Sequence, residues 1–200
     1  QLTQYFPLLL LFFIPAITMT VWADERKLGT DELLFTMPLT DLEILIGKYL
    51  SVLAVFSVAL LFSMTHVLVL AYLGNPDWGL LITTYFGYWI TGATLLSAGM
   101  FASSLTASPT VAFILGVLVC SVPVFIERIG GFFGLSELFS EFSLSEQFRD
   151  FGMGVVPFDG LLYFVPLTTL MLYLNLVVVS RRHWEPVSYT HLRAHETLLD

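Results

Sequence analysis

Residues 49–73 read YLSVLAVFSVALLFSMTHVLVLAYL, an apolar run that contains no Asp, Glu, Lys or Arg. A helix needs about 20 such residues to cross the ~30 Å hydrocarbon layer of a membrane, because each residue adds about 1.5 Å. The run therefore predicts a membrane-spanning helix. Its continuous hydrophobicity argues against a β-barrel strand, in which apolar and polar residues alternate.

Four further runs have the same character, at residues 5–22, 80–101, 110–126 and 161–179. Their interiors also lack acidic and basic residues, so each run can enter lipid without the cost of a buried charge. The whole chain is 56% hydrophobic, and its mean hydropathy of +0.83 lies well above that of soluble domains. We expect an all-α fold, a polytopic membrane bundle of five transmembrane helices that occupies residues 1–184.

The last 16 residues, EPVSYTHLRAHETLLD, are polar and differ in texture from the rest of the chain. We interpret residues 185–200 as a non-native or disordered tail. His191 and His195 are four residues apart, which would suit a metal on one helix face, and this is the alternative. Cys120 is the only cysteine, so neither an intramolecular disulfide nor a Cys-based zinc site is available within the chain.

Basic residues mark one side of the membrane. Three lie between the first two runs (Arg26, Lys27 and Lys48), and Arg181 and Arg182 follow the last run. Because Lys and Arg are retained on the cytosolic side, we expect residues 23–48 and the C terminus to be cytosolic. The net charge of −8 is divided between two sides of a membrane, and we expect no nucleic-acid partner. Aromatic rings near helix ends are typical of the headgroup layer; here these are Trp22, Tyr49, Trp78 and Trp184.

The charged segment between the first two runs has its own helix signals. Gly29 interrupts the chain, Thr30 can cap a new helix, and Pro38 ends it. Between them lie two acids for the first turn and three apolar side chains: Asp31, Glu32, Leu33, Leu34 and Met37. These residues predict a short helix at 30–37, and Thr40 with Glu43 predicts a capping box for the next helix. A simple surface turn between two spans is the alternative interpretation.

Two motifs resemble a known family, the permease subunits of type-2 ATP-binding-cassette exporters, and within it the gliding-motility and nitrous-oxide-reductase-maturation branch. The first motif is IPAIT followed by Met19, then ERK, Gly29, Thr30, ELL, Pro38 and the pair Gly47 and Lys48. The second is FRDFGMGVVPFDGLLYF at residues 148–164, with Arg181, Arg182 and Trp184 after the last run. The resemblance covers nearly all of residues 5–184.

The resemblance implies a six-helix permease half in a bacterial inner membrane, of which this chain would hold spans two to six and lack the first. It implies export powered by a separate cytosolic ATPase, a second permease half as partner, and a coupling helix at residues 30–37 on the ATPase. The implied contacts are Glu25, Arg26, Gly29, Thr30, Glu32, Leu33, Leu34 and Met37. ATP and Mg would belong to the ATPase, since the chain has no G-x-x-x-x-G-K-[ST] loop and no cofactor site of its own.

The connection at residues 127–160 predicts an outer amphipathic helix. Ser143 and Glu146 form a capping-box pattern, and Leu144, Phe148 and Phe151 recur at helical spacing. Three glycines before it would allow a turn, and Asp159 is a plausible N-cap for the last span; the glycines are Gly130, Gly131 and Gly134. The helix is interpreted as a cover over the helix ends, with an exit gate as the alternative.

Polar side chains within the spans are few. His66 and Asn175 are candidates for a translocation path, although a histidine bonded to a neighbouring helix is the simpler interpretation. Small residues in the third run favour close helix contacts; they are Gly87, Gly92, Ala93, Ser97, Ala98 and Gly99. Two other classes of protein stay open: a non-catalytic membrane scaffold, and an intramembrane enzyme, for which no H-E-x-x-H, G-x-S-x-G or paired intramembrane carboxylates are found.

Overall fold

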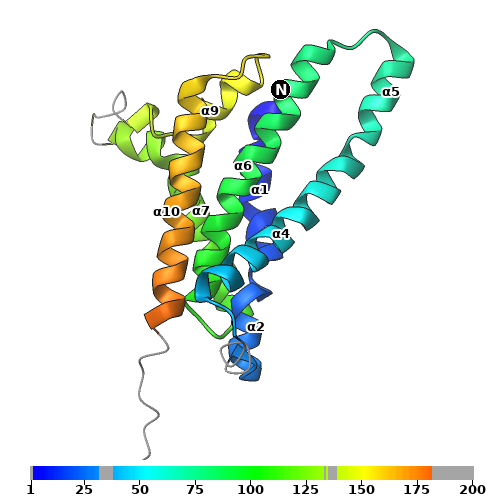
Figure 1. Cartoon of the computed structure of the whole chain (residues 1–200). Coiled ribbons are helices and arrows are strands. Elements are labelled where there is room, and N and C mark those ends of the chain that lie inside the picture. Colours follow the sequence, from blue (N-terminus) through cyan, green and yellow to red (C-terminus); the bar gives the residue numbers. More distant parts are fainter. Residues whose placement is uncertain (1, 32–37, 133, 135–138, 182–200) are drawn as a thin grey trace, which may run out of the picture.

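The computed structural model describes residues 2–31, 38–132, 134 and 139–181, and these ranges contain helices and no strand. The helices form a bundle from which α5 stands apart (Figure 1). They are α1 (Leu2–Thr18), α2 (Thr20–Leu28), α4 (Asp41–Ser63), α5 (Thr65–Leu73), α6 (Trp78–Ser104), α7 (Pro109–Phe132), α9 (Leu144–Phe151) and α10 (Phe158–Arg181). The prediction of an all-α membrane bundle is confirmed.

The centre of the bundle is α6, which packs against α1, α2, α4, α7, α9 and α10. Its small residues allow this crowding, as the sequence predicted. A Cβ added to Gly92 would lie 2.2 Å from the Phe56 ring of α4, and one added to Gly99 would lie 2.3 Å from the Thr18 hydroxyl of α1. The neighbouring helices therefore approach α6 more closely than larger side chains would permit.

By length and composition, four described helical stretches can cross a membrane: Tyr5–Leu28, Asp41–Leu73, Pro109–Phe132 and Phe158–Arg181. The expected third span, now α6, is long enough at 27 residues but is not among them. Its Thr, Ser, Tyr and Gly residues lower its hydropathy. Because protein surrounds α6, some of these hydroxyls find partners inside the bundle. Thr94 Oγ1 lies 2.9 Å from Thr168 Oγ1 of α10, whereas the buried Thr91 hydroxyl has no partner among the described residues. The hydrophobicity of a span thus reflects its exposure to lipid.

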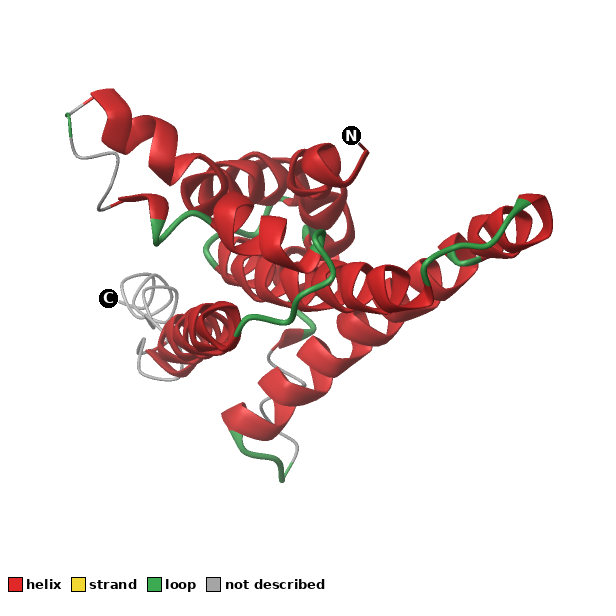
Figure 2. Cartoon of the chain, turned by 90° about the horizontal axis from the view of Figure 1, so that it is seen from above, coloured by secondary structure: helices red, strands yellow, loops and turns green. Residues whose placement is uncertain are grey.

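Two of the expected spans are each divided into two helices. The first breaks at Met19 and the second at Met64, where the Met64 N–H donates to the Leu61 carbonyl and the Val67 N–H to the Met64 carbonyl. These bonds reach back three residues instead of four, so the turn is tighter than an α-helix. Beyond the break, α5 contacts mainly α4, and its Tyr72 is 92% exposed. Seen from above, α5 and the loop that follows it project beyond the bundle (Figure 2).

The connection after the fourth span differs from its prediction. The helix α7 continues six residues past the expected end, through Phe132, and includes Gly130 and Gly131. Gly130 serves a close contact instead of a turn, since an added Cβ would lie 2.6 Å from Phe139. Of the three glycines, Gly134 alone has a left-handed φ, at 70°. The prediction of a turn is therefore correct for Gly134 and wrong for the other two.

The predicted outer helix is α9. Its Leu144, Phe148 and Phe151 are buried, and α9 packs against α1, α6 and α7 as a cover. Ser143 occupies the N-cap position, but its side chain makes no capping bond, so the predicted capping box is absent. The Ser143 hydroxyl is buried and has no hydrogen-bond partner among the described residues. Asp159 lies in the first turn of α10, so the prediction that it is the N-cap is wrong; the helix begins at Phe158, two residues earlier than an N-cap at Asp159 would allow.

Candidate functional site

The candidate site lies where α2 ends and α4 begins, on either side of residues 32–37. At the end of α2, Gly29 has φ 68° and its N–H donates to the Arg26 carbonyl, while the Thr30 N–H donates to the Glu25 carbonyl at 2.9 Å. This is the Schellman pattern, which favours glycine because an L side chain is strained at positive φ. The helix therefore stops at a fixed position, and the chain leaves it in a fixed direction.

A capping box fixes the start of α4, as predicted. The Glu43 N–H donates to Thr40 Oγ1, and the Thr40 N–H donates to the Glu43 carboxylate at 2.8 Å. Asp41 in the first turn also accepts a hydrogen bond of 2.8 Å from Ser180 Oγ, near the end of α10. The beginning of α4 is thereby joined to the last helix of the bundle.

Lys48 joins α4 to α2. Its ammonium pairs with the Glu25 carboxylate, donates to the Val21 carbonyl at 3.0 Å and lies 4.6 Å from the centre of the Trp22 ring. The side chains of Lys48 and Glu25 are 17% and 31% exposed, so the pair is shielded more than a surface ion pair. Trp22 is only 1% exposed, so its ring packs inside this junction.

Ser103 joins the same region to α6. Its hydroxyl accepts hydrogen bonds from the backbone N–H groups of Trp22 and Ala23, at 3.1 and 3.3 Å, and donates to the Met19 carbonyl at 3.0 Å. The first N–H groups of a helix, which in α2 include that of Trp22, have no partner within the helix. One side chain of the central helix therefore forms hydrogen bonds with three backbone groups at the break and holds α2 against the bundle.

We call these contacts, centred on Glu25, Lys48, Ser103 and Asp41, the tied end. They connect α2, α4, α6 and α10 through side chains that are mostly buried or half-buried. Packed elements that are joined in this way shift as units instead of deforming. A force applied to the segment between α2 and α4 would consequently move both helices together.

The structure brings some of the predicted contact residues together and leaves others undescribed. Glu25 is at the centre of the tied end, and Gly29 ends α2. Thr30 donates its hydroxyl to the Glu25 carbonyl, so it belongs to the end of α2. Arg26 lies in the last turn of α2. Four predicted contacts lie outside the described residues: Glu32, Leu33, Leu34 and Met37.

Lys48 and Ser103 belong to the tied end although neither was predicted as a contact residue. Lys48 was one position of the family motif, and its location directly before the apolar run at residues 49–73 could have marked it as a charge that needs a partner. Ser103 gave no signal, because its partners lie about 80 positions earlier in the chain. Serines of this kind are recognised only when helix breaks and their neighbours are known.

The two candidate path residues are not brought together. His66 lies exposed on α5, where its ring is 3.2 Å from the Tyr85 hydroxyl of α6, as expected for a histidine bonded to a neighbouring helix. Asn175 is fully buried in the last two turns of α10, and neither of its amide atoms has a hydrogen-bond partner among the described residues. Figure 1 shows that α5 and the end of α10 lie at opposite ends of the molecule.

The described residues contain no group of three or more His, Cys, Asp or Glu side chains that could hold a metal ion. The tied end is accordingly a mechanical junction of ion pair, hydrogen bonds and ring contact, with no nucleophile placed beside a base.

Comparison with protein families gives one match. The model of the ABC-2 family transporter proteins matches residues 2–187, nearly the whole chain and every described helix. Neither the curated proteins nor the solved structures gave a match. Permeases of this family are membrane subunits that normally work with a cytosolic ATP-binding-cassette ATPase. The chain belongs to the ABC-2 family of transporter proteins and is a multi-pass membrane permease of an ATP-binding-cassette transporter.

Proposed function

We propose that this permease exports its substrate across a bacterial inner membrane, and that a separate cytosolic ATPase drives it through residues 30–37. The ATPase would bind ATP and Mg, and closure of its nucleotide sites would displace the segment between α2 and α4. The observation that carries this proposal is the tied end, where Lys48 joins the two helices on either side of that segment. Ser103 and Asp41 extend the connection to α6 and α10.

Three further features support the arrangement. Basic residues gather at this end, which agrees with a cytosolic location for residues 23–48 and the C terminus. The capped ends of α2 and α4 give the segment fixed entry and exit points. The motif from Glu25 to Lys48 supports placement in the gliding-motility and nitrous-oxide-reductase-maturation branch, and a second permease half, identical or different, would complete the transporter.

The test uses Leu33→Asp in the complete protein, co-expressed with candidate ATP-binding-cassette ATPases until one co-purifies with the unaltered permease. A charge in an apolar docking contact is costly, so we expect ATPase co-purification and permease-stimulated ATP turnover to fall at least about tenfold, equivalent to ~1.4 kcal/mol. Leu73→Asp is the matched control, because it makes the same change at an exposed residue at the far end of α5. It should retain both signals.

Normal co-purification and turnover in Leu33→Asp would contradict the proposal, and a scaffold without ATPase coupling would then be the better interpretation. Protease protection in sealed vesicles supplies the second measurement. A cleavage site inserted after Gly29 should be cut only from the cytosolic face, and cutting from the outer face would overturn the assigned orientation.

A further inference from the structure

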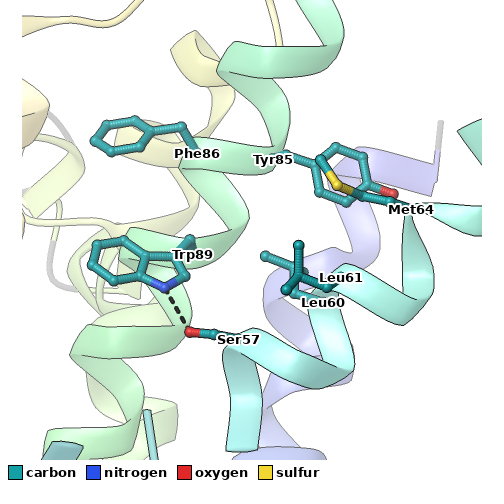
Figure 3. Close-up of a pocket in the computed structure, with 7 residues that line it drawn as sticks. All are labelled: Ser57, Leu60, Leu61, Met64, Tyr85, Phe86 and Trp89. Carbon is teal, nitrogen blue, oxygen red and sulfur yellow. Dashed lines mark hydrogen bonds between the residues drawn. The ribbon is translucent and has the colours of Figure 1, made fainter. Parts of the chain in front are cut away.

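The molecule has an open cavity of about 320 Å³ between α4 and α6 (Figure 3). Its volume falls at the lower end of the range of roughly 300–1,000 Å³ that is usual for small-molecule sites. The wall consists mainly of large apolar and aromatic side chains from the two helices and from the break after α4: Leu60, Leu61, Met64, Tyr85, Phe86 and Trp89. We call this cavity the α4–α6 groove.

Polar atoms in the groove wall are already paired with one another. The Trp89 indole N–H donates to Ser57 Oγ at 2.9 Å, as Figure 3 shows. The Tyr85 hydroxyl lies within hydrogen-bond distance of the His66 ring and the Ser63 carbonyl. A water molecule in a cavity needs two to four polar partners, and the groove offers it mainly hydrocarbon. The groove is therefore suited to an apolar occupant.

The depth of the groove can be followed along both helices. Ser57 lies 16 positions beyond Asp41, which corresponds to about 24 Å along α4, and Tyr85 and Trp89 lie roughly 10 and 17 Å from Trp78 at the opposite surface. Half of the hydrocarbon layer is about 15 Å thick. The groove thus lies mainly in the half of the bilayer farther from Asp41, which we call the distal leaflet, and reaches the middle of the bilayer at Trp89.

The groove opens sideways, where the medium is lipid. Leu61 and Met64 at its edge are exposed, as are Leu68 and Val69 further along α5. No charged residue occurs in α5 or in α4 beyond Lys48. A lipid of the distal leaflet is already at the opening and can enter by lateral diffusion, with its headgroup remaining near Trp78.

We propose that the α4–α6 groove binds one acyl chain of a distal-leaflet phospholipid, with the chain running past Tyr85 toward Trp89. This inference goes beyond ATPase coupling and does not depend on it, because it uses only the membrane location of α4 and α6. The separation of α4 and α5 from α6 beyond the tied end makes room for the chain (Figure 1).

The experiment uses phosphatidylethanolamine with a diazirine in its acyl chain, mixed into proteoliposomes that contain the complete protein. After illumination, we expect labelling of residues 57–64 and 85–89 to exceed labelling of Leu118 on α7, which is 58% exposed, by at least about fivefold, since chain groups held in the groove lose their contact with bulk lipid. Equal labelling of the groove and α7 in the unaltered protein would overturn the proposal.

Variants that fill the groove give the second measurement. Leu61→Phe with Met64→Phe should reduce groove labelling at least about fivefold, whereas Ile114→Phe with Leu118→Phe on α7 should leave it unchanged. Unchanged labelling in the filled variant would contradict an acyl-chain site. Met64→Cys distinguishes a second copy of the chain, because the other cysteine, Cys120, is buried. Efficient disulfide-linked dimers through position 64 would show that protein occupies the groove, and the lipid proposal would then be rejected.

Discussion

The two ends of α4 are held in very different ways. At its beginning, Lys48 and Asp41 join it to α2 and α10, and its Tyr49 hydroxyl donates to the Ala93 carbonyl of α6. Beyond its end, α5 has one buried residue, Val67, and a single hydroxyl contact from Tyr85 to His66. The stretch Asp41–Leu73 therefore contains two parts that are held differently. We call the beginning of α4 the base and α5 the arm.

This difference suggests how motion is transmitted. A helix fixed to its neighbours at the base carries displacement into the bundle, while an arm with few contacts can change its angle at low cost. The break at Met64 separates the two behaviours. If the permease is driven from the tied end, α6 is the helix that receives the displacement, because it contacts every other helix of the tied end.

The largest effect should come from widening the contact of α6 with α1. In Gly99→Leu the new side chain meets Thr18, which is fully buried and hydrogen-bonded to the Ile14 carbonyl, so it cannot move aside. We expect a loss of ~3 kcal/mol or more in the free energy of unfolding. The measurement is sodium dodecyl sulfate titration in mixed micelles.

Gly74→Leu is the counterpart beyond α5. Its φ of −171° is extended backbone, and an added Cβ meets no atom within 4 Å. We expect its unfolding to match that of the unaltered protein. Equal destabilisation by both substitutions would show that the two ends are packed alike, and the comparison would fail.

The ion pair of the tied end should have an intermediate effect. Lys48→Met leaves the Glu25 carboxylate half-buried beside Trp22, and we expect a loss of about 2 kcal/mol in the free energy of unfolding. Glu25→Gln with Lys48→Met removes both charges and should recover about half of that loss. The two single variants and the double variant form a cycle measured by the same titration. A coupling energy near zero would mean that the pair does not hold α2 to α4.

Much of the fold follows from local sequence signals. The apolar runs locate the lipid-facing helices, Thr40 with Glu43 gives the start of α4, and Gly29 gives the end of α2. The spacing of Leu144, Phe148 and Phe151 gives the buried face of α9. These signals act over a few residues, so a single sequence contains them in full.

The remaining features depend on contacts between distant residues. No proline or glycine lies near Met64, so the sequence contains no local signal for the helix break there. The Tyr85 hydroxyl that donates to the Ser63 carbonyl beside the break comes from another helix, α6. Lys48 and Glu25 are 23 positions apart, and Ser103 reaches back 80 or more. The burial of Asn175 likewise cannot be predicted from the neighbouring residues of α10. The central position of α6 is also not visible in its hydropathy. It is not among the four stretches that are apolar enough to cross a membrane, yet it packs against more helices than any of them.

The smallest expected effect tests whether α5 moves independently of the beginning of α4. Tyr85→Phe removes the hydroxyl that meets His66 and the Ser63 carbonyl, and a net loss of about 1 kcal/mol corresponds to roughly fivefold faster amide exchange in α5. Tyr49→Phe removes a hydroxyl from the same pair of helices near the base and should leave exchange in α5 unchanged. Hydrogen–deuterium exchange of the protein in nanodiscs measures both. If Tyr49→Phe accelerates α5 as much as Tyr85→Phe does, the arm is not independent of the tied end, and α4 and α5 move as one rigid helix.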